Sequence, residues 1–287
     1  MKNNRIFLLT AIAALLLSIS TGLWGLSPMY EEDYIREAAE YTERGDYNKA
    51  IASYTQAIQI NPKNTFTYNS RGALYVLTGD MDMAVADFNQ SLRLDPNNAW
   101  TYLNRGLMYY AKEDYDSAIT DYSQAIRLAP NYAEAFYYRG NAYFDKIDYN
   151  LAISDYSQAA RLAPNHAKAY FNRGITYIIK KDYTRAITDF AKVIELDPDN
   201  AMAYNLLFNT YCDKRDYNNA IKAALKATQR FPDDYDGYDN LGYGYEKKGD
   251  MAKAKTAYLQ AIILAPDPNP ENAYFNRPEA RQIVNAR

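Results

Sequence analysis

Residues 133–166 read AEAFYYRGNAYFDKIDYNLAISDYSQAARLAPNH, and residues 167–200 read AKAYFNRGITYIIKKDYTRAITDFAKVIELDPDN. Aligned without a gap, the two stretches share an aromatic residue at position 4, Arg-Gly at positions 7 and 8, Asp-Tyr at positions 16 and 17, Ala at 20, Asp at 23 and Pro at 32. Self-similarity at a fixed spacing of 34 residues indicates a chain built from copies of one unit.

Proline recurs every 34 residues, seven times in succession, at Pro62, Pro96, Pro130, Pro164, Pro198, Pro232 and Pro266. Placing it at position 32 predicts seven repeats with the bounds 31–64, 65–98, 99–132, 133–166, 167–200, 201–234 and 235–268. In this register Tyr occupies position 11, Asp position 16 and Ala position 20 in all seven copies. We therefore predict one uninterrupted array of repeats.

Each unit carries the pattern of two amphipathic helices. Apolar and small residues at positions 4, 8 and 11, and again at 17, 20, 21, 24, 27 and 28, follow steps of three and four residues. The invariant aspartate lies between the two helices, where its carboxylate can cap the second helix, and the proline ends that helix. The unit is therefore predicted to be a helical hairpin, and the protein to be all-α.

Repeat six departs most from this pattern. Phe208 replaces the glycine that most repeats have at position 8, and Ala224 replaces the aromatic residue of position 24. Arg230 stands where the other repeats have Ile or Leu. We expect repeat six to be the most loosely packed of the seven.

The composition narrows the classes of function. Charged residues make up 23% of the 287 residues, with a net charge of −3 and both signs spread along the chain, which lacks the basic footprint of a nucleic-acid-binding protein. The single cysteine, Cys212, cannot form an intramolecular disulfide, and neither it nor the single histidine, His166, has the neighbours of a zinc site or a catalytic pair. We predict no nucleic-acid partner, no cofactor, no metal and no catalytic residue.

Residues 1–28 form a separate segment. Lys2 and Arg5 precede 25 consecutive uncharged residues, which fit either a cleavable signal peptide or a membrane anchor, since residues 6–26 reach the roughly 20 residues that span a bilayer. Basic residues before the segment and acidic residues after it favour transfer of the remaining chain across the membrane. We predict an extracytoplasmic protein (periplasmic, cell-surface or secreted) that touches the membrane only through this segment if it is uncleaved.

The pattern resembles the tetratricopeptide repeat, whose 34-residue period and helical hairpin it matches over residues 31–268. The resemblance implies a right-handed superhelical α-solenoid of seven helix-turn-helix repeats, whose first helices line an inner groove. Residues 272–277, NAYFNR, echo the AYFNR of repeat five, and we expect residues 269–287 to form a C-terminal capping helix.

By the same resemblance, positions 2, 5, 9, 12 and 13 of each first helix face the groove. They are mostly apolar or aromatic in repeats two to five, as is typical of a contact site, and include Asn205, Asn209, Asp213, Asp236, Asp239 and Glu246 in repeats six and seven. The predicted groove residues are Phe66, Val76, Trp100, Leu103, Leu107, Tyr110, Tyr137, Asn141, Phe144, Phe171, Ile175, Ile178, Asn205 and Asn209. The alternative that Phe66, Trp100 and Phe171 pack on other parts of the fold stays open.

A second pattern links position 7 to position 23. Position 7 is arginine and position 23 is aspartate in repeats two to five, and neither residue stands at its position in the other three repeats. We predict bidentate ion pairs within single repeats: Arg71 with Asp87, Arg105 with Asp121, Arg139 with Asp155, and Arg173 with Asp189. The alternative, solvated charges on one face, also stays open.

These observations favour a non-enzymatic scaffold or adaptor of the cell envelope. Its partner would be a peptide or protein segment of unknown identity, bound in the groove through apolar anchors and with a basic end. Two alternatives remain: a module that binds a glycan or cell-wall ligand through Tyr, Trp and Asn side chains, and a non-catalytic subunit of an envelope enzyme complex.

Overall fold

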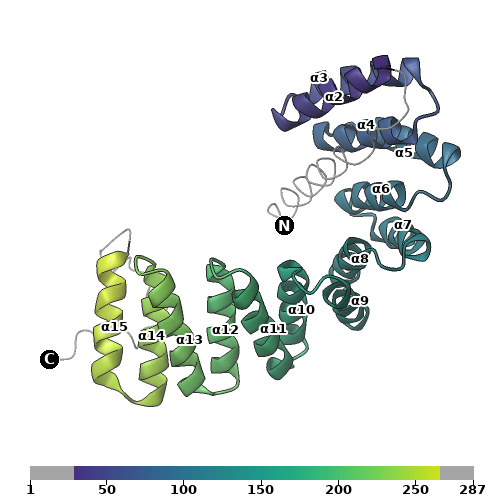
Figure 1. The fold of residues 1–287 in the computed structure, drawn as a ribbon. Helices are drawn as coiled ribbons and strands as arrows, with labels where there is room; N and C mark the ends of the chain where they lie inside the picture. Colours follow the sequence, from purple (N-terminus) through teal and green to yellow (C-terminus); the bar gives the residue numbers. More distant parts are fainter. Residues whose placement is uncertain (1–28, 266–287) are drawn as a thin grey trace. The chain divides into compact units, whose positions relative to one another are not determined.

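A computed structural model of the protein describes residues 29–265, and within them it contains fourteen α-helices in consecutive pairs and no strand (Figure 1). The helices are α2 (Met29–Glu43), α3 (Tyr47–Ile60), α4 (Thr65–Thr78), α5 (Met81–Leu94), α6 (Ala99–Ala111), α7 (Tyr115–Leu128), α8 (Ala133–Asp145), α9 (Tyr149–Leu162), α10 (Ala167–Ile179), α11 (Tyr183–Leu196), α12 (Ala201–Asp213), α13 (Tyr217–Arg230), α14 (Tyr235–Lys248) and α15 (Met251–Leu264). The all-α prediction is confirmed. The predicted N-terminal segment 1–28 and capping helix 269–287 lie outside the described residues.

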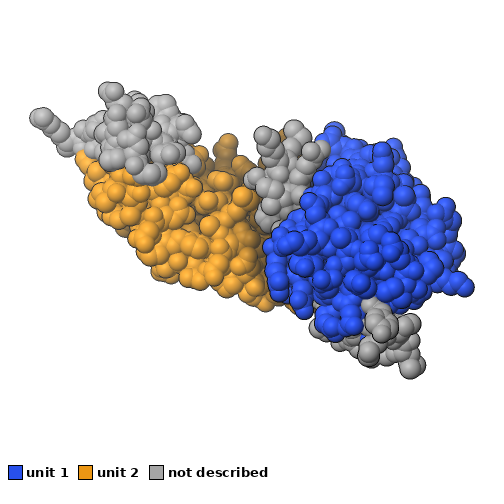
Figure 2. Space-filling view, turned by 90° about the horizontal axis from the view of Figure 1, so that it is seen from above, with its two compact units in different colours: residues 1–151 blue, residues 152–287 orange. Residues whose placement is uncertain are grey.

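The chain divides into two compact units, residues 1–151 (unit 1) and residues 152–287 (unit 2), shown in different colours in Figure 2. Within each unit, helices that are neighbours in sequence pack together. In unit 1, α4 packs on α5 and α5 on α6, and in unit 2, α12 packs on α13 and α13 on α14. Such nearest-neighbour packing is the rule in repeat architectures.

The turn between the two helices of a repeat has left-handed backbone at position 15. Glycine supplies it in three repeats, at Gly45, Gly79 and Gly249, with φ of 76°, 90° and 85°. The other four repeats have a side chain there: Glu113 (φ 63°), Ile147 (68°), Lys181 (60°) and Arg215 (57°). These four turns are strained, because the left-handed conformation costs an L-residue with a side chain about 1–2 kcal/mol.

The aspartate at position 16 precedes the second helix. Its carboxylate accepts a hydrogen bond from the backbone N–H three residues later at Asp114, Asp182, Asp216 and Asp250, which confirms the predicted cap. The side chains of Asp46 and Asp80 make no such bond, so the prediction is wrong there. Asp80 instead accepts a hydrogen bond from the Thr78 hydroxyl, at 2.8 Å.

Positions 8 and 24 meet where the two helices of a repeat approach most closely. A Cβ atom on Gly106 would lie 2.6 Å from the Tyr122 ring, and one on Gly242 would lie 2.5 Å from the Tyr258 ring. Carbon atoms in ordinary contact are about 3.5–4.0 Å apart. An aromatic residue at position 24 therefore favours glycine at position 8, and a larger residue at position 8, such as the alanine of repeat one, requires the ring to shift.

Repeat six reverses this arrangement. Phe208 at position 8 and Ala224 at position 24 each expose only 1% of their surface, and the Phe208 ring lies 6.4 Å from the Tyr243 ring. The large residue has moved to the other helix and still fills the core. One exchange compensates the other at these two positions. The helices α12 and α13 nevertheless pack together less extensively than the helix pairs α2/α3, α4/α5, α6/α7, α10/α11 and α14/α15, as the sequence predicts for repeat six.

Candidate functional site

The first helices of three repeats in unit 2 are α10, α12 and α14. Positions 2, 5, 9, 12 and 13 lie on one side of such a helix, and we call this side the first-helix face. On α10 it carries Phe171, Ile175 and Ile178, which are half-buried, and Ile179, which is exposed. The Phe171 ring packs edge-on against Phe190 of the same repeat, with 6.0 Å between ring centroids. Apart from the exposed Lys168 at position 2, this part of the face is apolar and partly accessible.

On α12 and α14 the same face is more polar, although it also carries Met202, which is 62% exposed, and the half-buried Tyr243. Asn209 is exposed, and Asn205 accepts a hydrogen bond of 3.0 Å from the Asn240 side-chain amide, which joins the two helices. Asp236 is exposed at the start of α14, and partial burial together with the nearby Asp234 raises its pKa. Unit 2 thus presents apolar, amide and acidic groups in succession along one face.

In unit 1 two predicted groove residues stack on each other. The rings of Phe66 and Trp100, which belong to consecutive repeats, have centroids 5.6 Å apart and planes inclined by 22°. Phe66 also contacts the ring of Tyr54 in the preceding repeat edge-on, at 6.5 Å. These half-buried side chains therefore hold neighbouring repeats together, which was the alternative left open by the sequence.

Three predicted groove residues are buried. Val76, Leu103 and Leu107 expose 2%, 0% and 0% of their surface and belong to the hydrophobic core of unit 1. The half-buried rings of Phe66 and Trp100 pack against the same core. The expectation that these three aliphatic residues are exposed is wrong, because a face of large apolar residues at helical spacing packs as core.

Tyr110 at position 12 is tied to the next repeat. Its hydroxyl donates a hydrogen bond to the carboxylate of Asp145, and its ring contacts Tyr115 with centroids 5.5 Å apart. Burial, and then the bond to Asp145, raise the pKa of Tyr110 well above its ordinary value. The hydroxyl is therefore a protonated donor within the fold.

The other predicted residues of α8 are half-buried. The Tyr137 ring meets Tyr138 edge-on at 5.2 Å, and the Phe144 ring meets Tyr149 at 5.6 Å. Asn141 is also half-buried. Aromatic residues on the first helices of unit 1 thus serve in packing.

Arginine at position 7 and aspartate at position 23 form the ion pairs predicted within single repeats. Nε and an Nη atom of each arginine donate to the two carboxylate oxygens, at 2.7 and 2.8 Å for Arg71 with Asp87, 2.7 and 2.7 Å for Arg105 with Asp121, and 2.9 and 2.6 Å for Arg173 with Asp189. The three aspartate side chains expose 7%, 4% and 3% of their surface. Arg139 and Asp155 lie in different units, and their pairing stays a prediction.

The remaining Nη1 of each arginine reaches the preceding repeat, which the sequence analysis missed. It donates to position 25 of that repeat: Arg71 to Thr55 (2.9 Å), Arg105 to Asn89 (2.6 Å), Arg139 to Ser123 (3.0 Å) and Arg173 to Ser157 (3.0 Å). Each of these arginines therefore links the second helix of one repeat to the first helix of the next.

A sequence signal for this link exists. Position 25 is Thr, Asn, Ser and Ser in repeats one to four, each of which precedes a repeat with arginine at position 7. It is Ala191, Leu225 and Leu259 in repeats five to seven. Reading position 25 against position 7 of the following repeat would have found the contact.

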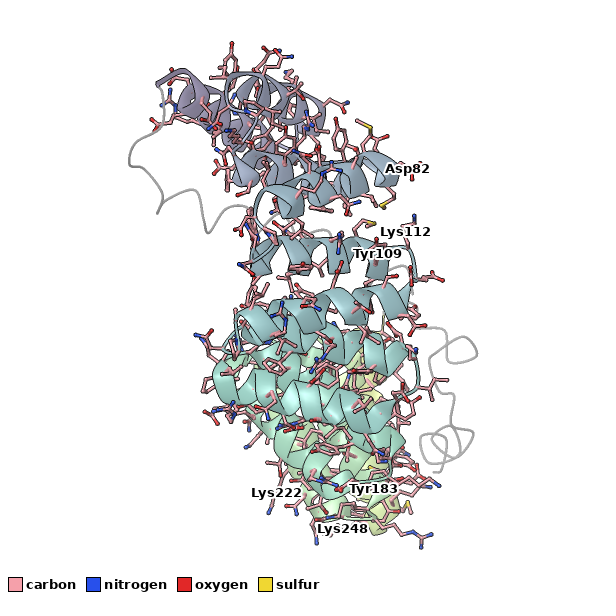
Figure 3. The ribbon with its side chains drawn as sticks, turned by 90° about the vertical axis from the view of Figure 1, so that its right-hand side faces the viewer. Asp82, Tyr109, Lys112, Tyr183, Lys222 and Lys248 are labelled. Carbon is pink, nitrogen blue, oxygen red and sulfur yellow. The ribbon has the colours of Figure 1, made fainter. Side chains whose placement is uncertain are left out.

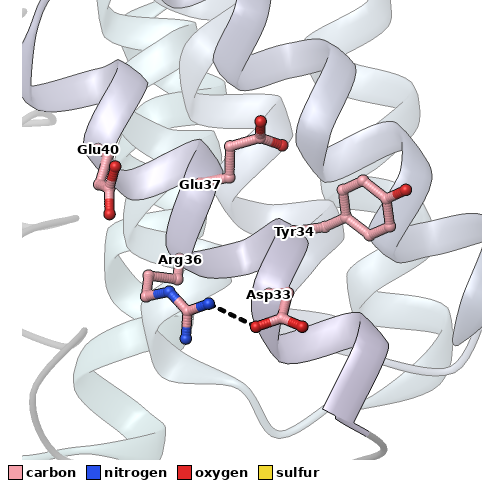
Figure 4. A pocket seen from close by; sticks show the side chains of 5 residues that line it. All are labelled: Asp33, Tyr34, Arg36, Glu37 and Glu40. Atoms are coloured by element: carbon pink, nitrogen blue, oxygen red, sulfur yellow. Dashed lines mark hydrogen bonds and ion pairs between the residues drawn. The ribbon is translucent and has the colours of Figure 1, made fainter.

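A shallow depression on α2 is not enclosed by other elements. Its lining consists of Asp33, Tyr34, Arg36, Glu37 and Glu40, all on one helix, and Arg36 pairs with Asp33 at 2.5 Å (Figure 4). Residues 29–265 contain no group of three or more His, Cys, Asp or Glu side chains placed to hold a metal ion. None of their helices combines the length and apolar character needed to cross a membrane.

Family models match the chain over most of its length. The model described as TPR repeat matches residues 38–79, 72–112, 106–146 and 140–178. Models described as tetratricopeptide repeat match residues 167–200, 190–222 and 235–268. A comparison with curated proteins gives no match.

Several solved structures are similar. The C-terminal part of a TPR repeat-containing protein from Cytophaga hutchinsonii has a TM-score of 0.70 and 19% identity, covering 88% of this chain and 100% of that chain. PilF of Pseudomonas aeruginosa has a TM-score of 0.62 and 18% identity, covering 72% and 95%. YrrB, described as a TPR protein with an unusual peptide-binding site, has a TM-score of 0.54 and 27% identity, covering 64% and 95%.

Proposed function

Because the chain belongs to the tetratricopeptide repeat family, whose members are protein-interaction scaffolds, we propose that it binds a segment of another protein along the first-helix face of unit 2. YrrB, which is 27% identical, is itself described as having a peptide-binding site. The role is non-enzymatic, as is typical of this repeat fold.

The succession of side chains on this face carries the proposal. Half-buried Phe171, Ile175 and Ile178 on α10 offer apolar contact area, and the exposed Asn209 amide on α12 can both donate and accept hydrogen bonds. The exposed Asp236 carboxylate on α14 favours a cation. The partner is therefore a segment with apolar anchors followed by a basic end.

A peptide library selected on the full chain tests this function. We expect selected peptides to combine apolar residues with Lys or Arg, and Ile175→Asp to weaken their binding about tenfold or more. Asn209→Ala, on the exposed polar part, should weaken binding less. Thr188→Asp, an exposed change on α11, is the matched control and should leave the affinity unchanged.

Two results would contradict the function: selected peptides without this composition, or peptides whose affinity does not respond to Ile175→Asp and Asn209→Ala. Circular dichroism of each variant separates lost binding from lost folding. Binding of a wall polysaccharide that Asn209→Ala abolishes would favour a glycan ligand instead.

The proposed location is the cell envelope. Its support is the sequence of residues 1–28, in which two cations precede 25 uncharged residues. Mass spectrometry of the mature N-terminus, combined with membrane fractionation, tests it. A mature chain that starts near residue 28, or a full chain in the membrane fraction, agrees with export or anchoring. An intact chain in the cytosolic fraction contradicts it.

A further inference from the structure

The second helices α13 and α15 of unit 2 contain basic residues and no acidic residues. α13, YNNAIKAALKATQR, contains Lys222, Lys226 and Arg230, and α15, MAKAKTAYLQAIIL, contains Lys253 and Lys255. Neither helix contains an Asp or a Glu. The second helices α5, α7 and α11 each contain both signs.

Two of these cations are held by carboxylates outside the helices. Arg230 pairs with Asp199, and Lys253 pairs at 2.8 Å with the aspartate that caps its own helix. Lys222 and Lys226 are exposed and have no carboxylate partner among the described residues. They are four residues apart on one helix, where like charges repel. Two unneutralised ammonium groups therefore stand side by side on the surface (Lys222 is labelled in Figure 3).

Large apolar side chains are exposed on the same helices. Leu225, Leu259 and Ile263 expose 37%, 41% and 72% of their surface. Leu225 and Leu259 occupy position 25, where Thr55 and Asn89 of unit 1 accept hydrogen bonds from the arginine of the next repeat. Repeats six and seven have thus exchanged an internal polar contact for exposed apolar surface.

We propose that Lys222, Leu225, Lys226, Leu259 and Ile263 form a surface that docks on a membrane containing anionic lipids. Ammonium groups can lie among the headgroup phosphates while the flanking leucine and isoleucine side chains enter the boundary with the acyl chains. Attraction of lysines to an anionic leaflet adds to this apolar contact. The inference goes beyond the proposed function, which concerns the opposite type of helix and a protein partner.

The contact has an expected salt dependence. The apolar part of the surface is three side chains, and the cationic part acts over a Debye length of about 8–10 Å at physiological ionic strength. The docking is therefore weak by itself and is released at high salt. Such a contact would orient unit 2 on the membrane once another segment of the chain has bound there.

A local probe tests the docking on the full chain. Thr256, exposed on α15 in the same surface, is changed to cysteine in a Cys212→Ser background and labelled with an environment-sensitive fluorophore. Vesicles contain phosphatidylcholine alone or phosphatidylcholine with phosphatidylglycerol. We expect a blue shift and protection from an aqueous quencher only with the anionic vesicles. The double variant Lys222→Glu with Lys226→Glu should lower the affinity for the anionic vesicles, as read by this probe, about tenfold or more.

The matched control makes the same change of charge in unit 1. Arg93→Glu with Arg127→Glu alters exposed cations on α5 and α7 and should leave the response intact. A probe at Thr256 that is equally quenched with both vesicle types overturns the proposal, even if residues 6–26 bind the chain to vesicles. Equal losses in both double variants overturn it too, as does a probe that responds to an acidic polypeptide but not to anionic vesicles. Peptide affinity in the lysine variant reports separately on the proposed function.

Discussion

Arg105 joins three helices through one side chain. Its Nε and Nη2 atoms bond to Asp121 on α7, and its Nη1 atom bonds to Asn89 on α5. The hydrogen bond to Asp121 raises the pKa of the guanidinium, which therefore stays charged. The side chains of Arg105 and Asp121 expose 20% and 4% of their surface, so water can replace a missing partner only in part.

Removing one member of this pair should cost more than removing both. We expect Asp121→Ala to lower the free energy of unfolding by about 3–5 kcal/mol, because it leaves a partly buried guanidinium unpaired. Arg105→Leu with Asp121→Ala reproduces the leucine and alanine of repeats six and seven and should cost much less. Urea denaturation measures both. A single variant no less stable than the double variant would show that the pair is merely a surface contact.

The left-handed turn residues offer a stabilising change. Ile147 has φ of 68° and exposes 69% of its surface, so Ile147→Gly relieves backbone strain and removes little packing. We expect a gain of about 1 kcal/mol in the free energy of unfolding. Gly79→Ala, at the equivalent turn with φ of 90°, should lose a similar amount. A lower melting temperature for Ile147→Gly would refute the assigned strain.

Buried tyrosines predict unfolding in alkali. Burial raises the pKa of Tyr54 to about 12, whereas an exposed tyrosine in the unfolded chain titrates near 10. The folded state holds this proton more tightly, so the stabilising contribution is complete below pH of about 10 and is lost as pH rises toward 12. The loss is about 1.4 kcal/mol per pH unit for each such tyrosine. Urea unfolding across this range should give a shallower decline for Tyr54→Phe, and equal slopes would contradict the assignment.

Within a repeat, the large buried side chain can stand at position 8 of the first helix or at position 24 of the second. Repeat one has Ala38 with Tyr54, and repeat six has Phe208 with Ala224; all four side chains are buried. We expect Phe208→Ala to cost about 3–5 kcal/mol through a cavity and Ala224→Tyr to cost about 1–3 kcal/mol through overpacking. The double variant, which has the arrangement of repeat one, should recover most of this loss. Thermal unfolding of the three variants measures the coupling, and additive losses would contradict it.

The helix pairs could be predicted from the sequence because several local signals agree. The period of 34 residues, the steps of three and four, the aspartate cap and the closing proline all indicate the same hairpin. The left-handed turns could be read only at Gly45, Gly79 and Gly249. Ile147 gives no such signal, since its conformation is imposed by the helices on either side and not by its own preference.

The bidentate pairs could be predicted, and the third contact of each arginine could not be read from one repeat. Positions 7 and 23 change together within a repeat, which made the pairing visible. Thr55, Asn89 and Ser157 each resemble an ordinary polar surface residue. Their role appears only when position 25 is compared with position 7 of the following repeat.

From the sequence alone, apolar residues that line a groove are hard to tell from apolar residues that form the core. Large apolar residues at helical spacing form either a groove or a core, and the pattern does not distinguish them. Leu103 and Leu107 are core residues, whereas Ile179 is exposed. What decides is the packing of the neighbouring repeats, which is a property of the folded stack.

The most direct test of the proposed function is the protection of Asn209 by a bound protein segment. Asn209→Cys in a Cys212→Ser background is labelled with a maleimide in the presence and absence of a library-selected peptide. Thr188→Cys on α11, which is also exposed, serves as the control. We predict that the peptide slows labelling at residue 209 in proportion to its occupancy and leaves residue 188 unchanged. Unchanged labelling at residue 209 with the peptide bound would contradict binding along the first-helix face of unit 2.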